Sequence, residues 1–587
     1  MNPIRRMETI FLAARRPFGM KKPRRWMTGV LPAVCVAGFA AGLLGTVCRS
    51  ASAQQTAYPT RTEAERDPVL KAMLAEMDRS KSQLQLKGFG KPYFLAYRME
   101  DVDVFETKAA FGATLRSTHH HLRFARVTVR VGDYKTDSSG GGGSALGLAA
   151  LDEDPIALRS ALWAATDQAY KSALADYAQK QAELKEVQTP PQADDFSHEP
   201  PVIRLEEPLK LSVDEAAWTA RVARDSGLCR TDATVKTSLR VLRYSMATFT
   251  AQTTTNWLVT SEGTIVRQSA AEFQENFAVG AQADDGMSLD RSYATTGSAL
   301  EDLDSPAVFG RHAVELIASL TALRNAPLVE GEYHGPVLLS SDAATDTLAV
   351  LLPPGLLATR PKLGTEARTN GPFASSYRTR VLPDFLDVTD DPGLKSYNGK
   401  GLVGAYDVDD EGVPAQAVKL IVAGQLENYL IGRGPVRDFP HSNGHGRAGI
   451  AGAPEPAIGV LKITARTGWT DEELNHKLLA LGSDEGLKEV YFVSTMGPGL
   501  TPRLLYRIRL NGPRAGRREL VRGAALDDLD LRTLRTGVVA AGKNLWVTNY
   551  FGDVPETVLA PALLLDNVTI HRANEKNDRL PYYPPPE

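Results

Sequence analysis

Three successive histidines, His119, His120 and His121, are the most conspicuous candidates for metal ligands. Alternate side chains of a strand point to the same face, so His119 and His121 would lie together if this segment is extended. Two imidazoles can bind zinc, but the sequence specifies no third ligand, and Arg116 and Arg123 would repel a cation. We therefore expect an exposed polar strand here rather than a metal site.

A second pair, His441 and His445, flanks Ser442-Asn443-Gly444 in a glycine-rich segment. If the segment folds back on itself, both imidazoles converge on one ion and build a zinc site outside any helix. A solvated loop is the simpler expectation. The metal-site alternative predicts bound zinc and a chelator-sensitive peptide hydrolysis that His445→Ala abolishes.

A run of acidic residues is the next candidate. Asp409, Asp410 and Glu411 could serve as paired catalytic carboxylates or as cation ligands. Gly412 and Pro414 follow them closely, and both residue types are typical of turns. We therefore expect a polar turn.

The chain has three cysteines, and only one belongs to the predicted mature protein. Cys35 and Cys48 lie in the predicted export signal, so Cys229 has no disulfide partner. No histidine lies near Cys229 in the sequence, which predicts a buried, unreactive thiol rather than a nucleophile.

Capping residues mark the elements that must hold these side chains. The pattern predicts helices that begin at Asp67-Pro68, Asp154-Pro155, Ser212, Asp304-Ser305 and Thr470-Asp471. Alternating apolar residues predict strands at 93–97, at 123–134 and across 233–281. Beyond Pro327 the chain changes to short strands separated by glycine and proline. The sequence thus predicts an α+β protein.

Two domains are expected from 587 residues. Residues 54–325 should form an N-terminal domain of a sheet plus helices, with a proline-rich exposed connection at 189–201. Residues 326–587 should form a C-terminal, mostly antiparallel β domain.

The first 53 residues are typical of an export signal. A basic stretch around Lys21 and Arg25 precedes an apolar run over 30–47, and Ala51-Ser52-Ala53 forms a cleavage site. Cleavage leaves a net charge of about −11 without a basic cluster, which argues against nucleic-acid binding. We expect a periplasmic protein of a Gram-negative envelope, with no stable membrane anchor. The export route (general or twin-arginine) and the start codon, Met1 or Met20, stay open.

Several segments of the second half resemble, in order and spacing, the C-terminal half of the TldD/PmbA metallopeptidase-like family. They are Leu382-Pro383-Asp384 to Asp390-Asp391-Pro392, 409–416, Leu420-Ile421, Gly424, Tyr429-Leu430 and Ser442-Asn443-Gly444. The resemblance implies a TldD/PmbA-type α+β fold. It also gives a set of candidate contacts for a peptide or partner subunit: Asp410, Glu411, Gly412, Asn443 and Gly444.

Active members of that family carry His-Glu-x-x-x-His on a helix and a cysteine near the C-terminus, which together bind zinc. In the corresponding stretch, 347–356, Ala349 and Pro354 replace the histidines and Val350 replaces the glutamate. No cysteine follows Cys229. These substitutions predict no catalytic residue and no cofactor, and Pro353-Pro354 should end the helix early.

The family also contains PmbA-like subunits, called TldE, that lack the motif and pair with TldD-like subunits in proteolysis. By resemblance, the chain is expected to be an exported, non-catalytic subunit that binds an extended peptide or pairs with a TldD-like protease subunit or with itself. Two alternatives remain open. One is a divergent zinc metallopeptidase with a relocated site, and the other is a stand-alone periplasmic binding or assembly protein.

Overall fold

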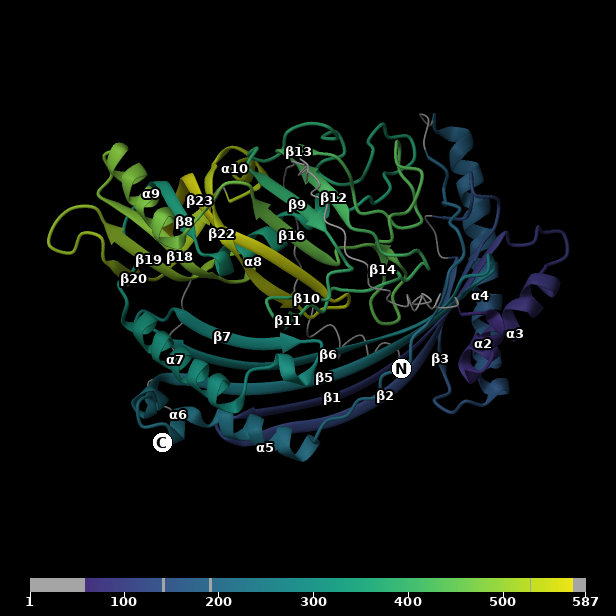
Figure 1. Ribbon diagram of the computed structural model, residues 1–587, viewed down its shortest axis with the longest axis horizontal. Coiled ribbons are helices and arrows are strands. Elements are labelled where there is room, and N and C mark those ends of the chain that lie inside the picture. Colours follow the sequence, from purple (N-terminus) through teal and green to yellow (C-terminus); the bar gives the residue numbers. More distant parts are fainter. Residues whose placement is uncertain (1–58, 140–142, 189–192, 528, 574–587) are drawn as a thin grey trace, which may run out of the picture.

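The computed structural model describes residues 59–139, 143–188, 193–527 and 529–573 (Figure 1). The predicted export signal, with Cys35 and Cys48, lies outside these ranges. The first half of the chain forms a long curved sheet backed by helices, and the second half forms a sheet-and-helix body over its other face. The predicted α+β class is confirmed. In the described ranges, no helix has the length and apolar character needed to span a membrane.

The first sheet has seven strands in the order β3-β2-β1-β5-β6, and β4 and β7 both pair with β6. The bounds are β1 (Phe94–Ala110), β2 (Ala113–Arg130), β3 (Ser144–Ala149), β4 (Ile203–Leu205), β5 (Leu242–Thr260), β6 (Ile265–Gln282) and β7 (Ser288–Gly297). The sequence predicted a much shorter first strand at 93–97. β1 continues through Glu100, Asp101 and Asp103, because buried residues such as Met99 and Val102 still alternate with them.

Helices cover one face of this sheet. They are α2 (Arg61–Ala64), α3 (Pro68–Gln83), α4 (Pro155–Glu186), α5 (Glu215–Ser226), α6 (Leu228–Thr231) and α7 (Pro306–Asn325), with 3₁₀ turns η1 (Lys236–Val241) and η2 (Leu300–Asp302). Asp67 and Asp154 cap α3 and α4, as predicted. The predicted start at Ser212 is wrong: Asp214 accepts a hydrogen bond from the Ala217 amide and starts α5.

The two faces of β1 have different partners. Leu95, Tyr97 and Met99 belong to the apolar core with α3 and α4, and Phe105 belongs to the core with α5 and α7. Because strand side chains alternate, Arg98 lies on the opposite face. There it donates hydrogen bonds to carbonyl groups of the second half. The long sheet therefore presents a polar face to the second half.

The second sheet has 12 strands in a main order of β13-β12-β9-β16-β23-β8-β18-β19-β20, extended by β17, β21 and β22. The bounds are β8 (Tyr333–Leu339), β9 (Leu386–Asp390), β12 (Val418–Val422), β13 (Gln425–Leu426), β16 (Val460–Ala465), β17 (Gly468–Trp469), β18 (Glu489–Met496), β19 (Pro502–Arg509), β20 (Arg518–Val521), β21 (Ala524–Asp527), β22 (Val538–Tyr550) and β23 (Glu556–Arg572). Three pairs are parallel, β16–β23, β8–β18 and β17–β22, and the other pairs are antiparallel.

Small elements complete the second half. Two ribbons form from β10 (Ser396–Tyr397) with β11 (Lys400–Gly401) and from β14 (Gly446–Arg447) with β15 (Glu455–Pro456). The helices and turns are α8 (Ser341–Leu351), η3 (Pro353–Gly355), α9 (Asp471–Asp484), η4 (Pro498–Leu500) and α10 (Leu531–Thr536). α9 begins after Thr470, as predicted. α8 packs against β23, β22 and β18.

Ion pairs join the two halves near both ends of β6. Before the start of β6, Glu262 binds Arg433 of the second half, with the closest atoms 2.6 Å apart. After its end, Asp285 binds Arg522 at 2.7 Å. These contacts fix the second half over the polar face of the long sheet.

Candidate functional site

Helix α8 carries positions 349 and 350, which the family resemblance places at the first histidine and the glutamate of the zinc motif. Ala349 and Val350 are partly buried and pack against the core of the second half, and the helix ends at Leu351. Pro354 lies in the following 3₁₀ turn. None of the alkyl side chains at 349, 350 and 354 has a lone pair for zinc or a proton to move. The residues at this position therefore do not fit a zinc ion. Over the whole described part of the chain, no three His, Cys, Asp or Glu side chains are grouped to hold a metal.

The same helix carries two carboxyl groups that the sequence analysis did not identify. Asp342 and Asp346 are one helical turn apart, and Asp346 precedes Ala349 and Val350 by three and four residues, which places them on one side. Burial raises the pKa of Asp342 to about 6, and the nearby charge of Asp346 adds to the shift. Burial also raises the pKa of Asp346. The sequence signal that could have identified this pair is two aspartates four residues apart in an otherwise apolar helix.

Tyr550 of β22 supports one of these carboxyl groups. Its hydroxyl donates to Asp346 Oδ1 at 2.7 Å, and burial together with that carboxylate raises the tyrosine pKa well above its usual value. The hydrogen bond opposes the upward shift of the Asp346 pKa, because it favours the ionised carboxylate. This side of α8 therefore carries a pair of partly buried carboxyl groups.

Removing this hydroxyl gives a first prediction. Tyr550→Phe should lower the free energy of unfolding by about 1–2 kcal/mol at pH 8, because the Asp346 carboxylate loses its donor. The loss should be smaller at low pH, because the raised pKa of Asp346 favours its protonated form there. Urea unfolding at both pH values measures it, and Tyr397→Phe, at a partly exposed position, is the control. An equal loss at both pH values would contradict this assignment.

A cavity of about 170 Å³ lies between the polar face of the long sheet and loops of the second half. The sheet contributes three basic residues, Arg98, Arg126 and Arg130. The second half contributes two of the predicted contact residues, Asp410 and Glu411. Phe94, Phe196 and Leu258 are among the apolar lining residues. The three arginines could not be recognised as a group from the sequence, because only the strand register brings them together.

The Asp409–Glu411 segment is a turn, as predicted. Buried Asp409 accepts hydrogen bonds from the amides of Glu411, Val413 and Gly446 at 3.0, 2.8 and 2.8 Å. Burial and the charge of Glu411 raise the pKa of Asp409 well above its usual value, and burial raises that of Glu411. Asp410 accepts from the Ala448 amide at 2.8 Å. These carboxyl groups hold the loop beside the cavity.

Of the other predicted contact residues, Asn443 and Gly444 are buried and serve the fold. The Asn443 side chain accepts from the Ile431 amide at 2.8 Å and donates to the Tyr429 carbonyl at 2.7 Å. Gly412, whose φ is 84°, packs against Thr264 of the first half. The predicted set is therefore brought together, but only Asp410 and Glu411 line the cavity.

Gly444 gives a second prediction. Its φ is 73°, and an added Cβ would lie 2.2 Å from the Pro414 carbonyl oxygen. Gly444→Ala should therefore cost about 3 kcal/mol of stability, from a left-handed backbone and a backbone clash. Gly399→Ala, with φ of 79° and nothing within 4 Å, isolates the backbone effect and should cost about 1 kcal/mol. Thermal unfolding distinguishes the two variants, and equal losses would show that the clash is absent.

The histidine candidates lie in different environments. His445 is fully buried: one ring nitrogen lies 3.0 Å from the Asn443 carbonyl oxygen, and the other lies 3.2 Å from Asp390 Oδ1. The His441 side chain is exposed and lies 3.8 Å from Glu199. The expectation of a solvated loop is wrong for 442–446, which is buried because it packs against β9 and the 429–431 segment.

The His119–His121 segment and Cys229 have the environments that the sequence predicted. His119 and His121 are exposed on β2 and bind Asp103 and Asp101 of β1, so this segment is an exposed polar strand. The hydrogen bond with Asp103 raises the pKa of His119. Cys229 is buried and free, and burial raises the pKa of its thiol, which makes it unreactive.

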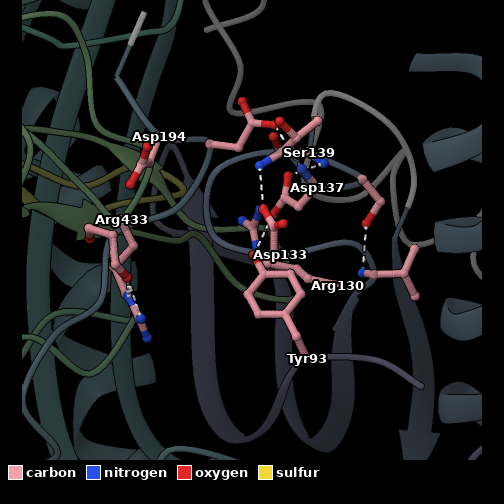
Figure 2. Close-up of polar contacts among 12 residues, drawn as sticks. Tyr93, Arg130, Asp133, Asp137, Ser139, Asp194 and Arg433 are labelled. Atoms are coloured by element: carbon pink, nitrogen blue, oxygen red, sulfur yellow. Dashed lines mark hydrogen bonds and ion pairs between the residues drawn. The ribbon is translucent and has the colours of Figure 1, made fainter. Parts of the chain in front are cut away.

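A polar network fixes the wall of the cavity around Arg130 (Figure 2). The Tyr93 hydroxyl and Arg130 Nη1 both donate to Asp137 Oδ2, at 2.7 and 2.8 Å. The Ser139 amide donates to the other carboxylate oxygen of Asp137 at 2.6 Å. The Arg130 guanidinium also lies 3.9 Å from the centre of the Phe196 ring. The site is therefore held rigidly on the side of the long sheet.

Comparison with protein families identifies the second half. Residues 331–572 match the family model of the PmbA/TldA metallopeptidase C-terminal domain. No curated protein matches the chain.

Solved structures resemble nearly the whole chain in fold. The proposed DNA gyrase modulator of Thermotoga maritima and TldE of Thermococcus kodakarensis each have a TM-score of 0.56 and 14% identity, covering 85% of this chain and 99% of theirs. A proposed DNA gyrase modulator of Bacteroides thetaiotaomicron has a TM-score of 0.55 and 12% identity, covering 86% of this chain and 98% of its own.

Proposed function

The chain belongs to the TldD/PmbA family, and on this basis we propose that it is an exported, non-catalytic subunit that binds an extended peptide or pairs with a TldD-like protease subunit. The observation that carries the proposal is the composition of helix α8. Alanine, valine and proline occupy the motif positions, and the helix ends before the last of them. A peptidase of this family needs a zinc-bound water and a general base, and these side chains supply neither.

A free strand edge supports binding by strand addition. β3 pairs with β2 only over 123–128, and no described strand pairs with the outer edge of β2 over 113–122. Leu115 in this segment has 59% of its side chain exposed. Unpaired backbone N–H and C=O groups along such an edge can take up an added strand of a peptide or a partner subunit.

The first experiment tests the absence of catalysis. The mature protein is incubated with equimolar zinc, dialysed and analysed for metal, and then assayed on an unstructured peptide with and without a chelator. We expect no stoichiometric zinc and no chelator-sensitive hydrolysis. Tightly bound zinc with hydrolysis that His445→Ala abolishes would instead support the relocated metal site.

The second experiment tests pairing. A purified TldD-like subunit that carries His-Glu-x-x-x-His is mixed with this chain and analysed by sedimentation and peptide hydrolysis. We expect a complex, and Leu115→Asp should weaken it at least tenfold. Leu148→Asp on β3, at an equally exposed position, should leave it unchanged. A lone monomer under all conditions would favour a stand-alone binding or assembly protein.

The third experiment tests export. Cell fractionation should place the protein in the periplasm, and N-terminal sequencing should begin at Gln54, directly after Ala53. Recovery of an intact N-terminus in the membrane fraction would contradict cleavage.

A further inference from the structure

Two arginines of the cavity lie directly opposite each other in the long sheet. Arg98 of β1 is the register partner of Arg126 of β2, and both side chains line the cavity. Like charges in directly opposite positions destabilise a sheet. Burial, together with the charge of Arg98, lowers the pKa of Arg126 to about 10. The sheet therefore holds two guanidinium groups side by side, and Glu100 pairs with Arg98 at 3.1 Å.

Each cavity arginine is anchored by some of its guanidinium nitrogens. Arg98 Nη2 donates to Glu100 at 3.1 Å and to the Gly452 carbonyl at 2.7 Å. Arg126 Nη1 donates to Ser144 Oγ at 2.6 Å, and its Nη2 donates to the Ala451 carbonyl oxygen. Arg130 is anchored on Asp137, as described above. Their positions are therefore fixed before any ligand binds.

Other donor atoms of the same side chains have no acceptor. Arg98 Nε and Nη1, Arg126 Nε and Arg130 Nε are buried, and no acceptor in the described part of the chain reaches them. Arg98 is only 4% exposed, so these donors are largely withdrawn from solvent. Buried donors without acceptors cost about 1–3 kcal/mol each, more when charged. Such a cost is expected where a ligand supplies the acceptors.

The neighbouring carboxyl groups do not fill this role. Asp410 Oδ1 lies 3.9 Å from Arg98 Nη1, beyond hydrogen-bond distance, and its Oδ2 is occupied by the Ala448 amide. Glu411 accepts from the Arg433 amide. The missing partner is thus a group rich in hydrogen-bond acceptors.

We propose that this cavity binds a compact oxyanion, a carboxylate or a phosphate, through Arg98, Arg126 and Arg130. Guanidinium groups match both anions in geometry and charge. A volume of about 170 Å³ holds roughly five water molecules, which suits such a group but not a whole peptide. Inorganic phosphate and the free C-terminus of a peptide are two sources of the same chemistry. The assignment does not depend on the proposed function.

Calorimetry on the full mature chain tests the site with three probes: inorganic phosphate, an acetylated dipeptide with a free carboxylate, and the same dipeptide amidated. We expect phosphate or the free acid to bind in the micromolar to low millimolar range, at constant ionic strength, and the amide not to bind. Binding of phosphate alone or of the free acid alone identifies the source. No binding of either, or equal binding of acid and amide, would overturn the proposal.

Variants test whether the cavity is responsible. Arg126→Gln should weaken binding at least tenfold, whereas Arg116→Gln, on the exposed end of the same strand, should leave it unchanged. Arg126→Lys keeps the positive charge but lacks Nε and the planar fork, and should weaken binding severalfold in a folded protein. Thermal unfolding without ligand checks the fold. Unchanged binding in both Arg126 variants would contradict the assignment.

Discussion

Replacing Arg433 with methionine should lower the free energy of unfolding by about 3–5 kcal/mol, the largest loss expected from a single substitution here. Arg433 is 2% exposed and binds both carboxylate oxygens of Glu262, at 2.6 and 2.8 Å. It also donates to the Ser197 carbonyl at 3.2 Å and lies 4.0 Å from the centre of the Phe196 ring. The substitution leaves a carboxylate without its counter-ion between the two halves.

Denaturant unfolding measures this effect, and two variants serve as controls. Removing both charges with Arg433→Met and Glu262→Met should cost less than the sum of the single losses, because no unpaired charge remains. Arg380→Met breaks an exposed pair with Asp384 at a similar distance, 2.7 Å, and should cost under about 1 kcal/mol. A loss below 1 kcal/mol in Arg433→Met would show that this pair does not hold the halves together.

Glu272→Gln should stabilise the protein at pH 8 by up to about 3 kcal/mol and have little effect at pH 4. Glu272 is buried on the polar face of β6, where burial raises its pKa to about 7 and only Arg447 opposes the shift. The folded state therefore binds a proton more tightly than the unfolded chain does. Stability that is present below about pH 4.5 is lost as the pH rises towards 7, and the neutral glutamine avoids that loss.

Urea unfolding between pH 4 and 8 tests this prediction. The gain in Glu272→Gln should appear progressively above pH 4.5, whereas Glu153→Gln, at an exposed position, should show no trend. A gain that is constant across the range would indicate a packing effect rather than a buried charge.

Local signals were sufficient for most helices and for the fold class. Asp67, Asp154 and Thr470 were identified correctly as helix caps, because capping depends on residues a few positions apart. Strand lengths were underestimated, since the acidic residues of β1 resemble a loop when their pairing with His119 and His121 of β2 is unknown. The α5 start was displaced for a related reason: Ser212 and Asp214 are both acceptable caps, and packing decides between them.

The candidate site could not be predicted in the same way, because it is formed by contacts between residues that are distant in the sequence. Arg98 and Arg126 meet only through the β1–β2 register. His445 is buried because it packs against Asp390, 55 residues away, and a glycine-rich sequence gives no sign of this. The assignment of motif positions to α8 rests on family resemblance alone and stays a prediction.

Under the proposed correspondence with the zinc motif, the end of α8 at Leu351 has a consequence for building a metal site here. Substituting histidine at 349 and glutamate at 350 would place both side chains on the helix. Residue 354, however, lies in a 3₁₀ turn whose backbone is restricted by Pro353. A histidine there would not face its partner one helical turn away. Introducing such a metal site would therefore require a change in the main chain at 352–355 as well as new side chains.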